Sequence, residues 1–504
     1  MKITLEVVEG PETGRVFEFA EADSFLVGRS PKAHFVLDPR ADQQISRHHC
    51  LIDVRPPRCT VQDLESKNGT FVNHQRTRQK ELANGDEIQV GRTTMRVLFS
   101  DVDDEELPPA QCYRCGQELD LSSPGRTLMC NACSLADLAR KSKEIEILPY
   151  PNGTVPPSQF ACGGCGKDLS DHADKDGRAT YVPDAAYLCT DCAKRVFVGG
   201  AGGTQLGHYR ILREIGRGGM GVVYKAVHEE SRRICAVKQI LPDVARDDKA
   251  LKLFDREIGV QSMVVHPNLA RVLERSLDNN TYFFVVEYLP GGDLNHLISK
   301  VFRGPLEPGL ACRFILDVLE GVEALHRHGF VHRDLKPSNF LLTRSHEDPT
   351  ALAKVTDYGL AKSFEEAGNS LFTRVGEAGG SLMFMPPEQI LDYRFVKPPT
   401  DVYAVGVSLY LMLTAKYTAQ FATPAKQFPK VGDALRPRHP IKVILEDPPI
   451  PILERMPQLP KSLARVVDTA VQKDLEKRFT SAAAFAEDLR NAVAKEGLSL
   501  QHAD

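Results

Sequence analysis

Apolar and polar positions alternate over the first hundred residues of the chain. Near both ends of this stretch every second residue is apolar, as at Ile3, Leu5, Val7, Met95, Val97 and Phe99. A period of two matches a β-strand, in which successive side chains point to opposite faces. The turn-forming pairs Asn68-Gly69 and Asn84-Gly85 separate strand-like runs. The pattern predicts an all-β domain over residues 1–100.

The pattern changes twice after that domain. Residues 108–195 contain eight cysteines, and the glycine-rich residues 196–206 predict a flexible linker. A strand-like section begins near residue 209 and is followed after about residue 291 by longer helical patterns. Strands followed by helices are typical of an α+β domain, so residues 207–495 are predicted to form a two-lobed α+β unit.

The length and composition of the chain are those of a multidomain globular protein. At 504 residues the chain is too long for a single hydrophobic core. Its formal net charge of −4 gives no reason to expect a general polyanion binder. The first residues show no basic flank before an apolar core, and the longest apolar run, residues 402–413, is too short to span a bilayer. We therefore expect a cytoplasmic protein without a membrane partner.

Eight of the twelve cysteines form four C-x-x-C pairs. The pairs are Cys112 and Cys115, Cys130 and Cys133, Cys162 and Cys165, and Cys189 and Cys192. Four thiolates in two such pairs suit tetrahedral zinc, and filling all four positions with cysteine leaves the metal no open site. The sequence therefore predicts two structural Zn2+ ions in zinc-ribbon-like motifs. A redox switch through C-x-x-C disulfides is the alternative.

The charge of the cysteine-rich region bears on its partner. Residues 108–195 hold 10 Lys+Arg against 11 Asp+Glu, a net charge of −1. Zinc ribbons also bind nucleic acid, but a protein that binds the phosphate backbone needs positive charge. We therefore expect a spacer or protein-docking role and no nucleic-acid partner.

A glycine-rich stretch opens the α+β section. Gly216, Gly218 and Gly221 form G-x-G-x-x-G, whose backbone can approach phosphates closely. Alone this motif is weak, because a dinucleotide-binding fold also uses it. Lys238, in the next strand-like run, can hold the α- and β-phosphates of ATP. Glu257, on a predicted helix, is the candidate partner that fixes the position of Lys238.

The stretch from His332 to Asn339, HRDLKPSN, has every part of a catalytic loop for phosphoryl transfer. Asp334 can accept the proton of a substrate hydroxyl, and Lys336 can neutralise charge on the transferring phosphoryl group. Asn339 and Asp357, the latter in an Asp-Tyr-Gly motif, can hold Mg2+ or Mn2+.

In this order the motifs resemble the Hanks-type (eukaryotic-like) protein kinase family, especially its bacterial Ser/Thr members. Six motifs in the family's order are not expected by chance. The lysine two residues after Asp334, and Ser381 in GGSLMFMPPE, imply Ser/Thr rather than Tyr specificity. The resemblance also implies that Arg478 pairs with Glu388 and that Asp401 braces the second lobe.

The resemblance further implies where ATP binds. The adenine is expected between Val223, Ala236 and Leu341, beside a hinge at residues Glu287 to Leu289. Val286 takes the gatekeeper position, and its small side chain implies an accessible back pocket.

Two positions depart from the kinase pattern. Tyr358 replaces the usual Phe, and Pro386 replaces the usual Ala before Pro-Glu. Neither change removes a catalytic group. The Tyr358 hydroxyl is predicted to bond Gln261, since a buried amide needs a partner. Water or backbone is the alternative partner for this hydroxyl.

Arg333 precedes the catalytic aspartate. In kinases with that arginine, a phosphate on the activation segment often pairs with it and orders the segment. The candidate phosphorylation sites are Ser363, Ser370, Thr373 and Ser381. We favour activation by phosphorylation at Thr373, because Ser381 fits better as a hydroxyl of the substrate loop.

Three stretches of the first domain, VGRS (27–30), ISRHH (45–49) and DLESKNGTFVN (63–73), resemble the forkhead-associated (FHA) family. That family implies a β-sandwich whose loops bind phosphothreonine peptides, and a dianionic phosphate favours arginine, hydroxyl and amide donors. The implied ligand-binding residues are Arg29, Ser46, Arg47, Lys67, Asn68 and, for the peptide backbone, Asn73. His49 is predicted to be a buried structural residue. A sandwich that keeps the motif only for folding is the alternative.

The motifs together predict a Ser/Thr protein kinase that uses ATP, phosphorylates proteins including itself, and recognises phosphothreonine through its first domain. The alternative is a non-catalytic pseudokinase scaffold with two binding modules, although no catalytic group is missing. A zinc-dependent nucleic-acid module regulated by the kinase is a third hypothesis, which the near-neutral charge opposes.

Overall fold

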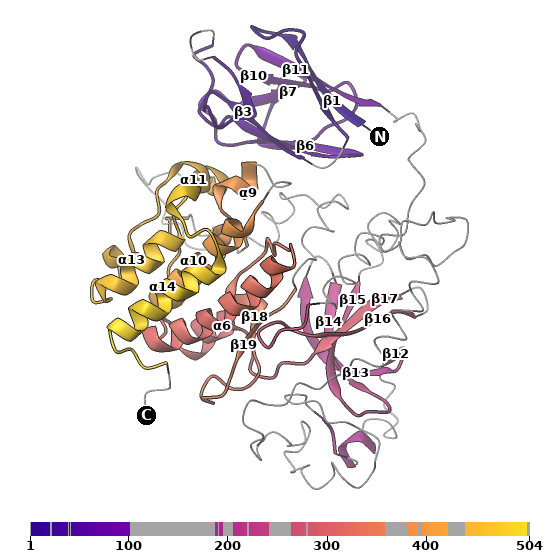
Figure 1. Cartoon of the computed structure of the whole chain (residues 1–504). Coiled ribbons are helices and arrows are strands. Elements are labelled where there is room, and N and C mark those ends of the chain that lie inside the picture. Colours follow the sequence, from indigo (N-terminus) through magenta and orange to yellow (C-terminus); the bar gives the residue numbers. More distant parts are fainter. Residues whose placement is uncertain are drawn as a thin grey trace, which may run out of the picture.

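The computed structural model describes two folded regions and a short connecting piece. The described residues are 2–20, 23–38, 40, 42–100, 187–189, 191–194, 205–218, 221–240, 264–278, 281–357, 381–391, 396–421 and 439–500. Figure 1 shows an N-terminal sandwich, a strand-rich lobe and a helical lobe. Within these described ranges no helix is long and apolar enough to cross a membrane.

The N-terminal domain is a sandwich of two β-sheets, as its alternating pattern predicts. The first sheet, ordered β2-β1-β11-β10-β7-β8, consists of β1 (Lys2–Glu9), β2 (Val16–Phe19), β7 (Thr70–Val72), β8 (Gln75–Thr77), β10 (Glu87–Val90) and β11 (Thr93–Ser100). The second, ordered β4-β3-β5-β6-β9, consists of β3 (Asp23–Gly28), β4 (Phe35–Val36), β5 (Cys50–Arg55), β6 (Arg58–Asp63) and β9 (Gln79–Glu81). Inward-facing residues of both sheets, such as Ile3, Leu5 and Ile52, form its core.

The strand-rich lobe is one antiparallel sheet ordered β12-β13-β14-β15-β17-β16. Its strands are β12 (Gln205–Leu206), β13 (Tyr209–Gly218), β14 (Gly221–His228), β15 (Ile234–Ile240), β16 (Val272–Asp278) and β17 (Thr281–Glu287). The glycine-rich motif falls at the tip of the β13–β14 hairpin, where Gly218 pairs with Gly221. At Gly221 a Cβ atom would lie 2.1 Å from the carbonyl oxygen of Gln239, so only glycine fits there.

The helical lobe is built around a central helix, α10 (Pro398–Thr414), which is buried at every position from Thr400 to Thr414. The other helices are α5 (Leu294–His296), the π-helix η3 (Leu297–Val301), α6 (Pro308–Arg327), α9 (Pro387–Leu391), α11 (Pro440–Glu446), α12 (Ile452–Arg455), α13 (Lys461–Ala470) and α14 (Ala482–Lys495). Short 3-10 turns are η4 (Pro337–Asn339), η5 (Ser381–Phe384) and η7 (Leu475–Lys477), and β18 (Phe340–Leu342) pairs with β19 (Ala353–Val355). The α+β prediction is therefore confirmed.

One C-x-x-C pair lies in the described part of the chain. Cys189 and Cys192 are buried, and the backbone N–H of Cys192 donates to Cys189 Sγ at 3.4 Å. Both cysteines pack with Val227 of β14 and Ile234 of β15. The backbone N–H of Leu188 also donates to the carbonyl oxygen of Arg232 at 3.1 Å, so this segment lies on the sheet of the strand-rich lobe.

The sandwich and the helical lobe are in contact. Figure 1 shows the sandwich lying over α9 and α11. Apolar residues of β3 and β5 share one buried cluster with apolar residues of η5, α9 and α11. The first and last domains therefore meet directly, although more than a hundred residues separate them in the sequence.

Candidate active site and phosphopeptide site

One buried carboxylate holds the catalytic loop on the helical lobe. Asp401 of α10 accepts the backbone N–H groups of His332 at 2.8 Å and Arg333 at 2.9 Å. His326, at the end of α6, places Nε2 2.8 Å from the same carboxylate. Burial by itself would raise the pKa of Asp401, but these neighbours hold it below its usual value. The ionised carboxylate therefore fixes the loop, including Arg333 in its left-handed conformation with φ of 70°.

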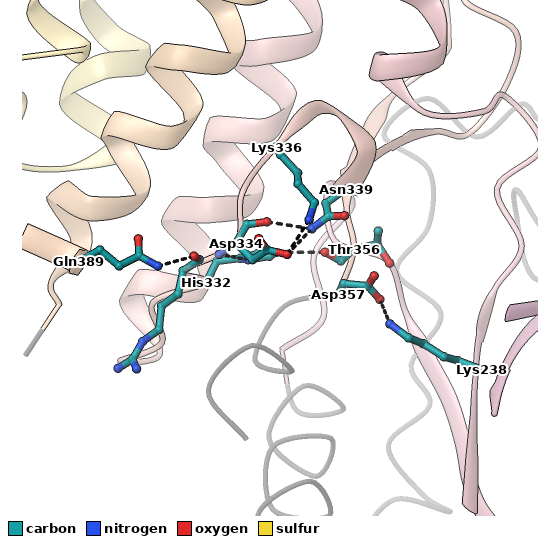
Figure 2. A network of polar contacts seen from close by, with 9 residues as sticks. Lys238, His332, Asp334, Lys336, Asn339, Thr356, Asp357 and Gln389 are labelled. Carbon is teal, nitrogen blue, oxygen red and sulfur yellow. Dashed lines mark hydrogen bonds and ion pairs between the residues drawn. The ribbon is translucent and has the colours of Figure 1, made fainter. Parts of the chain in front are cut away.

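Three functional side chains converge within the loop (Figure 2). Lys336 Nζ lies 2.9 Å from Asp334 Oδ2. Asn339 Nδ2 donates to the backbone carbonyl of Asp334 at 2.8 Å and to its Oδ2 at 3.4 Å. Because the Asn339 amide nitrogen is engaged in this way, its amide oxygen is the atom suited to a metal ion. The side chains assigned to proton acceptance, charge neutralisation and metal binding thus lie together.

The strand-rich lobe reaches this site through Lys238 of β15. Its Nζ lies 2.8 Å from Asp357 Oδ1 (Figure 2). Burial tends to raise the pKa of Asp357, but the adjacent ammonium group holds that pKa below its usual value. The backbone N–H of Thr356 donates to the carbonyl oxygen of Asn339 at 2.9 Å. The two predicted metal ligands, Asn339 and Asp357, therefore belong to adjacent, hydrogen-bonded stretches.

The predicted adenine-binding residues lie on both lobes. Val223 and Ala236 belong to the paired strands β14 and β15, and Leu341 belongs to β18. The hinge residue Glu287 ends β17, and its carboxylate lies 2.8 Å from Lys354 Nζ and accepts the backbone N–H of Arg271 at 2.8 Å. Because its side chain is engaged, a base at the hinge would meet the backbone of Glu287 and not its carboxylate.

Two residues that position the catalytic loop were not predicted from the sequence. Gln389 of α9 donates from Nε2 to the carbonyl oxygen of Arg333 at 2.7 Å (Figure 2). His326 contacts Asp401, as described above. The only sequence signal for Gln389 was its place directly after Glu388, and nothing local marks His326.

The predicted pair between Arg478 and Glu388 is confirmed. The guanidinium is fully buried and meets the carboxylate through two contacts, at 2.6 Å and 3.3 Å. It also donates to the backbone carbonyls of Gln472 and Pro399. This bidentate pair connects α9 with the segment before α14.

Several predicted residues lie outside the described part of the chain and stay predictions. They are Glu257, Gln261, Tyr358, Ser363, Ser370 and Thr373, with Cys112, Cys115, Cys130, Cys133, Cys162 and Cys165. The proposed contacts of Lys238 with Glu257 and of Tyr358 with Gln261 are among them. In the ranges that the structure does describe, no three His, Cys, Asp or Glu side chains gather as a metal site.

The predicted phosphopeptide residues other than Asn73 gather on three loops at one end of the sandwich. The backbone N–H of Arg29 donates to the carbonyl of Ser46 at 3.1 Å, and Ser46 Oγ accepts the N–H of Lys67 at 3.0 Å. Arg29, Arg47 and Lys67 have exposed side chains, as does Asn68. At Gly28, just before Arg29, a Cβ atom would lie 2.2 Å from the carbonyl oxygen of Arg47, so glycine allows two loops to touch.

The two asparagines of this site have partners within the domain. Asn68 Nδ2 donates to the carbonyl of Gln44 at 2.7 Å. Asn73 donates to Asp86 Oδ1 at 2.7 Å and accepts the backbone N–H of Glu87 at 2.9 Å. Asn73 was predicted to bond a peptide backbone; its amide keeps a second N–H and a second lone pair for such a contact, and this role stays a prediction.

His49 is a buried part of the loop framework, as predicted. Its Nδ1 accepts the backbone N–H of Ser46 at 3.2 Å, and its Nε2 lies 3.1 Å from the carbonyl oxygen of Gly69. Accepting at one nitrogen and donating at the other requires the neutral imidazole. Burial lowers the pKa of His49, although the Gly69 carbonyl opposes this shift.

The two lobes, the catalytic loop and the glycine-rich hairpin define the protein kinase class. The sequence model of the protein kinase domain family matches residues 209–489, and the sequence model of the FHA domain family matches residues 25–91. Because the kinase model covers more than half of the 504 residues, the chain belongs to the protein kinase family. It also has an FHA domain at its N-terminal end.

Curated relatives of this chain are bacterial kinases. It is 32% identical over 295 residues to the serine/threonine-protein kinase pkn3 of Myxococcus xanthus, covering 57% of this chain and 50% of that protein. It is 30% identical over 298 residues to the serine/threonine-protein kinase PknA of Mycobacterium tuberculosis, covering 57% and 61%. The chain thus spans about half to three fifths of these relatives' lengths. The solved PknI kinase domain of M. tuberculosis aligns at 21% identity over 58% of this chain and 99% of that domain, with a TM-score of 0.42.

Proposed function

We propose that this chain transfers the γ-phosphoryl group of ATP to Ser and Thr hydroxyls of proteins, its own chain included. The observation that supports this most is the convergence of Asp334, Lys336 and Asn339 in a loop fixed by Asp401. Phosphoryl transfer depends mainly on positioning and charge stabilisation, which such a preformed loop supplies. The similarity to named Ser/Thr kinases supports the same function.

Each catalytic side chain then has one task. Asp334 orients the substrate hydroxyl and accepts its proton, and Lys336 stabilises charge on the phosphoryl oxygens. Lys238 binds the ATP phosphates, since its ammonium group already lies beside Asp357. The amide oxygen of Asn339 and the ionised carboxylate of Asp357 suit Mg2+ or Mn2+, which neutralises phosphate charge when bound.

Replacing the proton acceptor tests this function. We expect Asp334→Asn to lower the initial rate of phosphate transfer to dephosphorylated casein at least 100-fold, since a positioned general base contributes about 10²–10⁴-fold. Binding of a fluorescent ATP analogue should stay within twofold of wild type. The control is Asp488→Asn, a partly exposed carboxylate on α14. No measurable transfer by wild type would contradict the proposal and favour a pseudokinase scaffold, and equal measurable rates for wild type and Asp334→Asn would contradict the role of Asp334.

The FHA domain is proposed to bind phosphothreonine through Arg29, Ser46, Arg47, Lys67 and Asn68, and the peptide backbone through Asn73. The exposed cations at one end of the sandwich support this, because arginine pairs well with a dianionic phosphate. Ser46 Oγ and Asn68 add a hydroxyl and an amide on the adjoining loops.

An affinity measurement tests the phosphothreonine site. A charge-assisted contact is worth about 1.5–3 kcal/mol, so Arg29→Ala should weaken binding of a phosphothreonine peptide library roughly 10- to 100-fold. Arg58→Ala is the matched control, since Arg58 is an exposed arginine on β6. Fluorescence anisotropy with phosphorylated and unphosphorylated libraries reports the difference. Equal affinity for both libraries would reject phosphothreonine recognition.

Two structural Zn2+ ions in the cysteine-rich segment remain part of the proposal. The buried pair Cys189 and Cys192 supports it, because a backbone N–H already donates to one sulfur, as expected for a thiolate ligand. When bound, the metal supplies cross-links between distant stretches of chain and no catalytic chemistry. The other six cysteines would complete the two sites.

A further inference from the structure

The outer face of one FHA sheet is buried where a sandwich ordinarily faces water, and an apolar pair lies on it beside the buried ion pair of Asp53 and Arg55. In β3 and β5 the core residues Val27 and Ile52 point between the two sheets. Their neighbours Leu26 and Leu51, which pair in register, therefore point outward, yet both have 0% exposure. All six residues of β5 are buried, whereas a strand with one solvated face alternates. Something must cover this face.

The helical lobe covers it. Apolar residues of the FHA domain and of η5, the residue after it, α9 and α11 form one buried cluster. Its members are Leu26, Ala33, Leu51 and Leu64 from the FHA domain, and Leu382, Met385, Ile390, Ile441 and Ile444 from the helical lobe. We call this contact the FHA–kinase interface.

Polar contacts surround the apolar centre of the FHA–kinase interface. His48 Nδ1 lies 2.9 Å from Glu446 Oε1. Glu65 accepts the backbone N–H of His439 at 2.8 Å through its carboxylate and Lys442 Nζ at 3.1 Å through its carbonyl. An apolar centre within a rim of matched polar groups is the usual composition of a specific protein interface. The FHA domain therefore has a second binding surface, which borders its phosphopeptide loops.

The interface lies beside the catalytic loop. Leu382 and Met385 belong to the segment that the sequence assigned to the substrate loop, and both are buried in the cluster that they share with the FHA domain. From α9, Gln389 contacts the carbonyl of Arg333, the residue before Asp334. A polypeptide that presents a hydroxyl to Asp334 has to extend along neighbouring surface, and the FHA domain occupies that surface on the side of η5, α9 and α11.

The phosphopeptide loops stay accessible in this arrangement. The side chains of Arg29, Arg47 and Lys67 are exposed. Their chain neighbours His48 and Glu65 make the rim contacts. The domain can therefore hold its own kinase and still present its cations to a phosphate.

We propose that the FHA domain docks on the helical lobe of its own chain and competes there with protein substrates. The partner of the apolar patch around Leu26 and Leu51 is the surface formed by η5, α9 and α11. Docking holds phosphorylation of large protein substrates below the rate that the catalytic site can reach. The part of this proposal that concerns rate rests on the kinase function proposed above, and the docking itself does not.

A charge placed in the apolar patch around Leu26 and Leu51 tests the proposal. Leu51→Glu in the full chain should increase hydrogen exchange in η5 and α11 at least tenfold and raise the initial rate on dephosphorylated casein at least threefold. Leu98→Glu is the matched control, because Leu98 lies on β11 in the other sheet and is 36% exposed. The control should leave exchange and rate within twofold of wild type. Retained phosphothreonine-peptide binding verifies that the Leu51→Glu domain is folded.

A charge pair at the rim gives a second, reversible test. His48→Glu places two carboxylates face to face across the interface and should open it in the same way. Adding Glu446→Lys on the same chain should restore the wild-type exchange and rate. Unchanged exchange in η5 and α11 in both opening variants would overturn docking. Faster hydrogen exchange in η5 and α11 together with an unchanged or lower rate on casein would overturn competition while leaving the kinase function intact. Faster hydrogen exchange in η5 and α11 with no phosphate transfer by wild type or any variant would support docking and overturn the proposed kinase function.

Discussion

At the scale of single residues, buried hydrogen-bond partners decide what the recognisable motifs do. The catalytic loop is recognisable in the sequence, but its shape depends on Asp401, which lies about seventy positions away. Arg333 and Asp357 both have positive φ, at 70° and 59°, although neither is glycine. Such conformations cost about 1–3 kcal/mol each and persist where the surroundings enforce them. Asp401 supplies this constraint for Arg333.

His49 gives a pH dependence at the same scale. Its Nδ1 must stay unprotonated to accept the N–H of Ser46, so the folded FHA domain keeps it neutral. Burial lowers the pKa of His49 in the folded chain, whereas histidine in the unfolded chain has a pKa of about 6.5. Below that pH the unfolded chain binds more protons, so this contribution to stability is complete at pH 7.5 and declines as the pH falls.

We predict that the free energy of opening of wild type exceeds that of His49→Gln at pH 7.5, and that this difference shrinks as the pH is lowered to 5.5. Hydrogen exchange of β5 and β7 in the full chain, corrected for the intrinsic effect of pH, measures the free energy of opening. His74→Gln serves as the control, since His74 is exposed in the same domain. A wild-type advantage that is the same at both pH values would contradict the assigned role.

At the scale of elements, the short segment with Cys189 and Cys192 is an example of a piece too small to fold alone. It comprises a few residues before a single helical turn, far below the length at which an isolated helix is stable. Its order comes from packing on β14 and β15 and from the bond between Leu188 and Arg232. Metal bound by these cysteines would therefore also stabilise the strand-rich lobe.

Metal analysis and hydrogen exchange test this coupling. Wild type should contain two zincs per chain, and Cys189→Ser should lose about one of them and exchange faster in β14 and β15, because metal binding contributes directly to folding. Cys312→Ser, at a buried cysteine of α6 outside the four pairs, should keep both zincs. A zinc-free wild type that forms reducible disulfides would instead favour the redox alternative.

At the scale of the whole molecule, the arrangement of the domains is the feature that the sequence predicted least. The same sandwich offers two surfaces: loops whose cations stay exposed, and a sheet face that covers η5, α9 and α11. His48 and Glu446, which meet at its rim, are 398 positions apart. The sequence left open whether the FHA domain acts on its own chain. The contact favours action on its own kinase domain, and Leu51→Glu is the experiment that decides this.

The sequence by itself determined the two folded domains, the order of the kinase motifs, the burial of His49 and the pair of Arg478 with Glu388. These features follow from local periodicity or from residue types at fixed spacing in a known family pattern. Only the tertiary structure decided the roles of Gln389 and His326, the engagement of Asn73, and the FHA–kinase interface. A strand such as β5, whose six residues are all buried, does not encode which partner covers its outer face. That choice depends on burial between surfaces hundreds of residues apart, for which no local pattern exists.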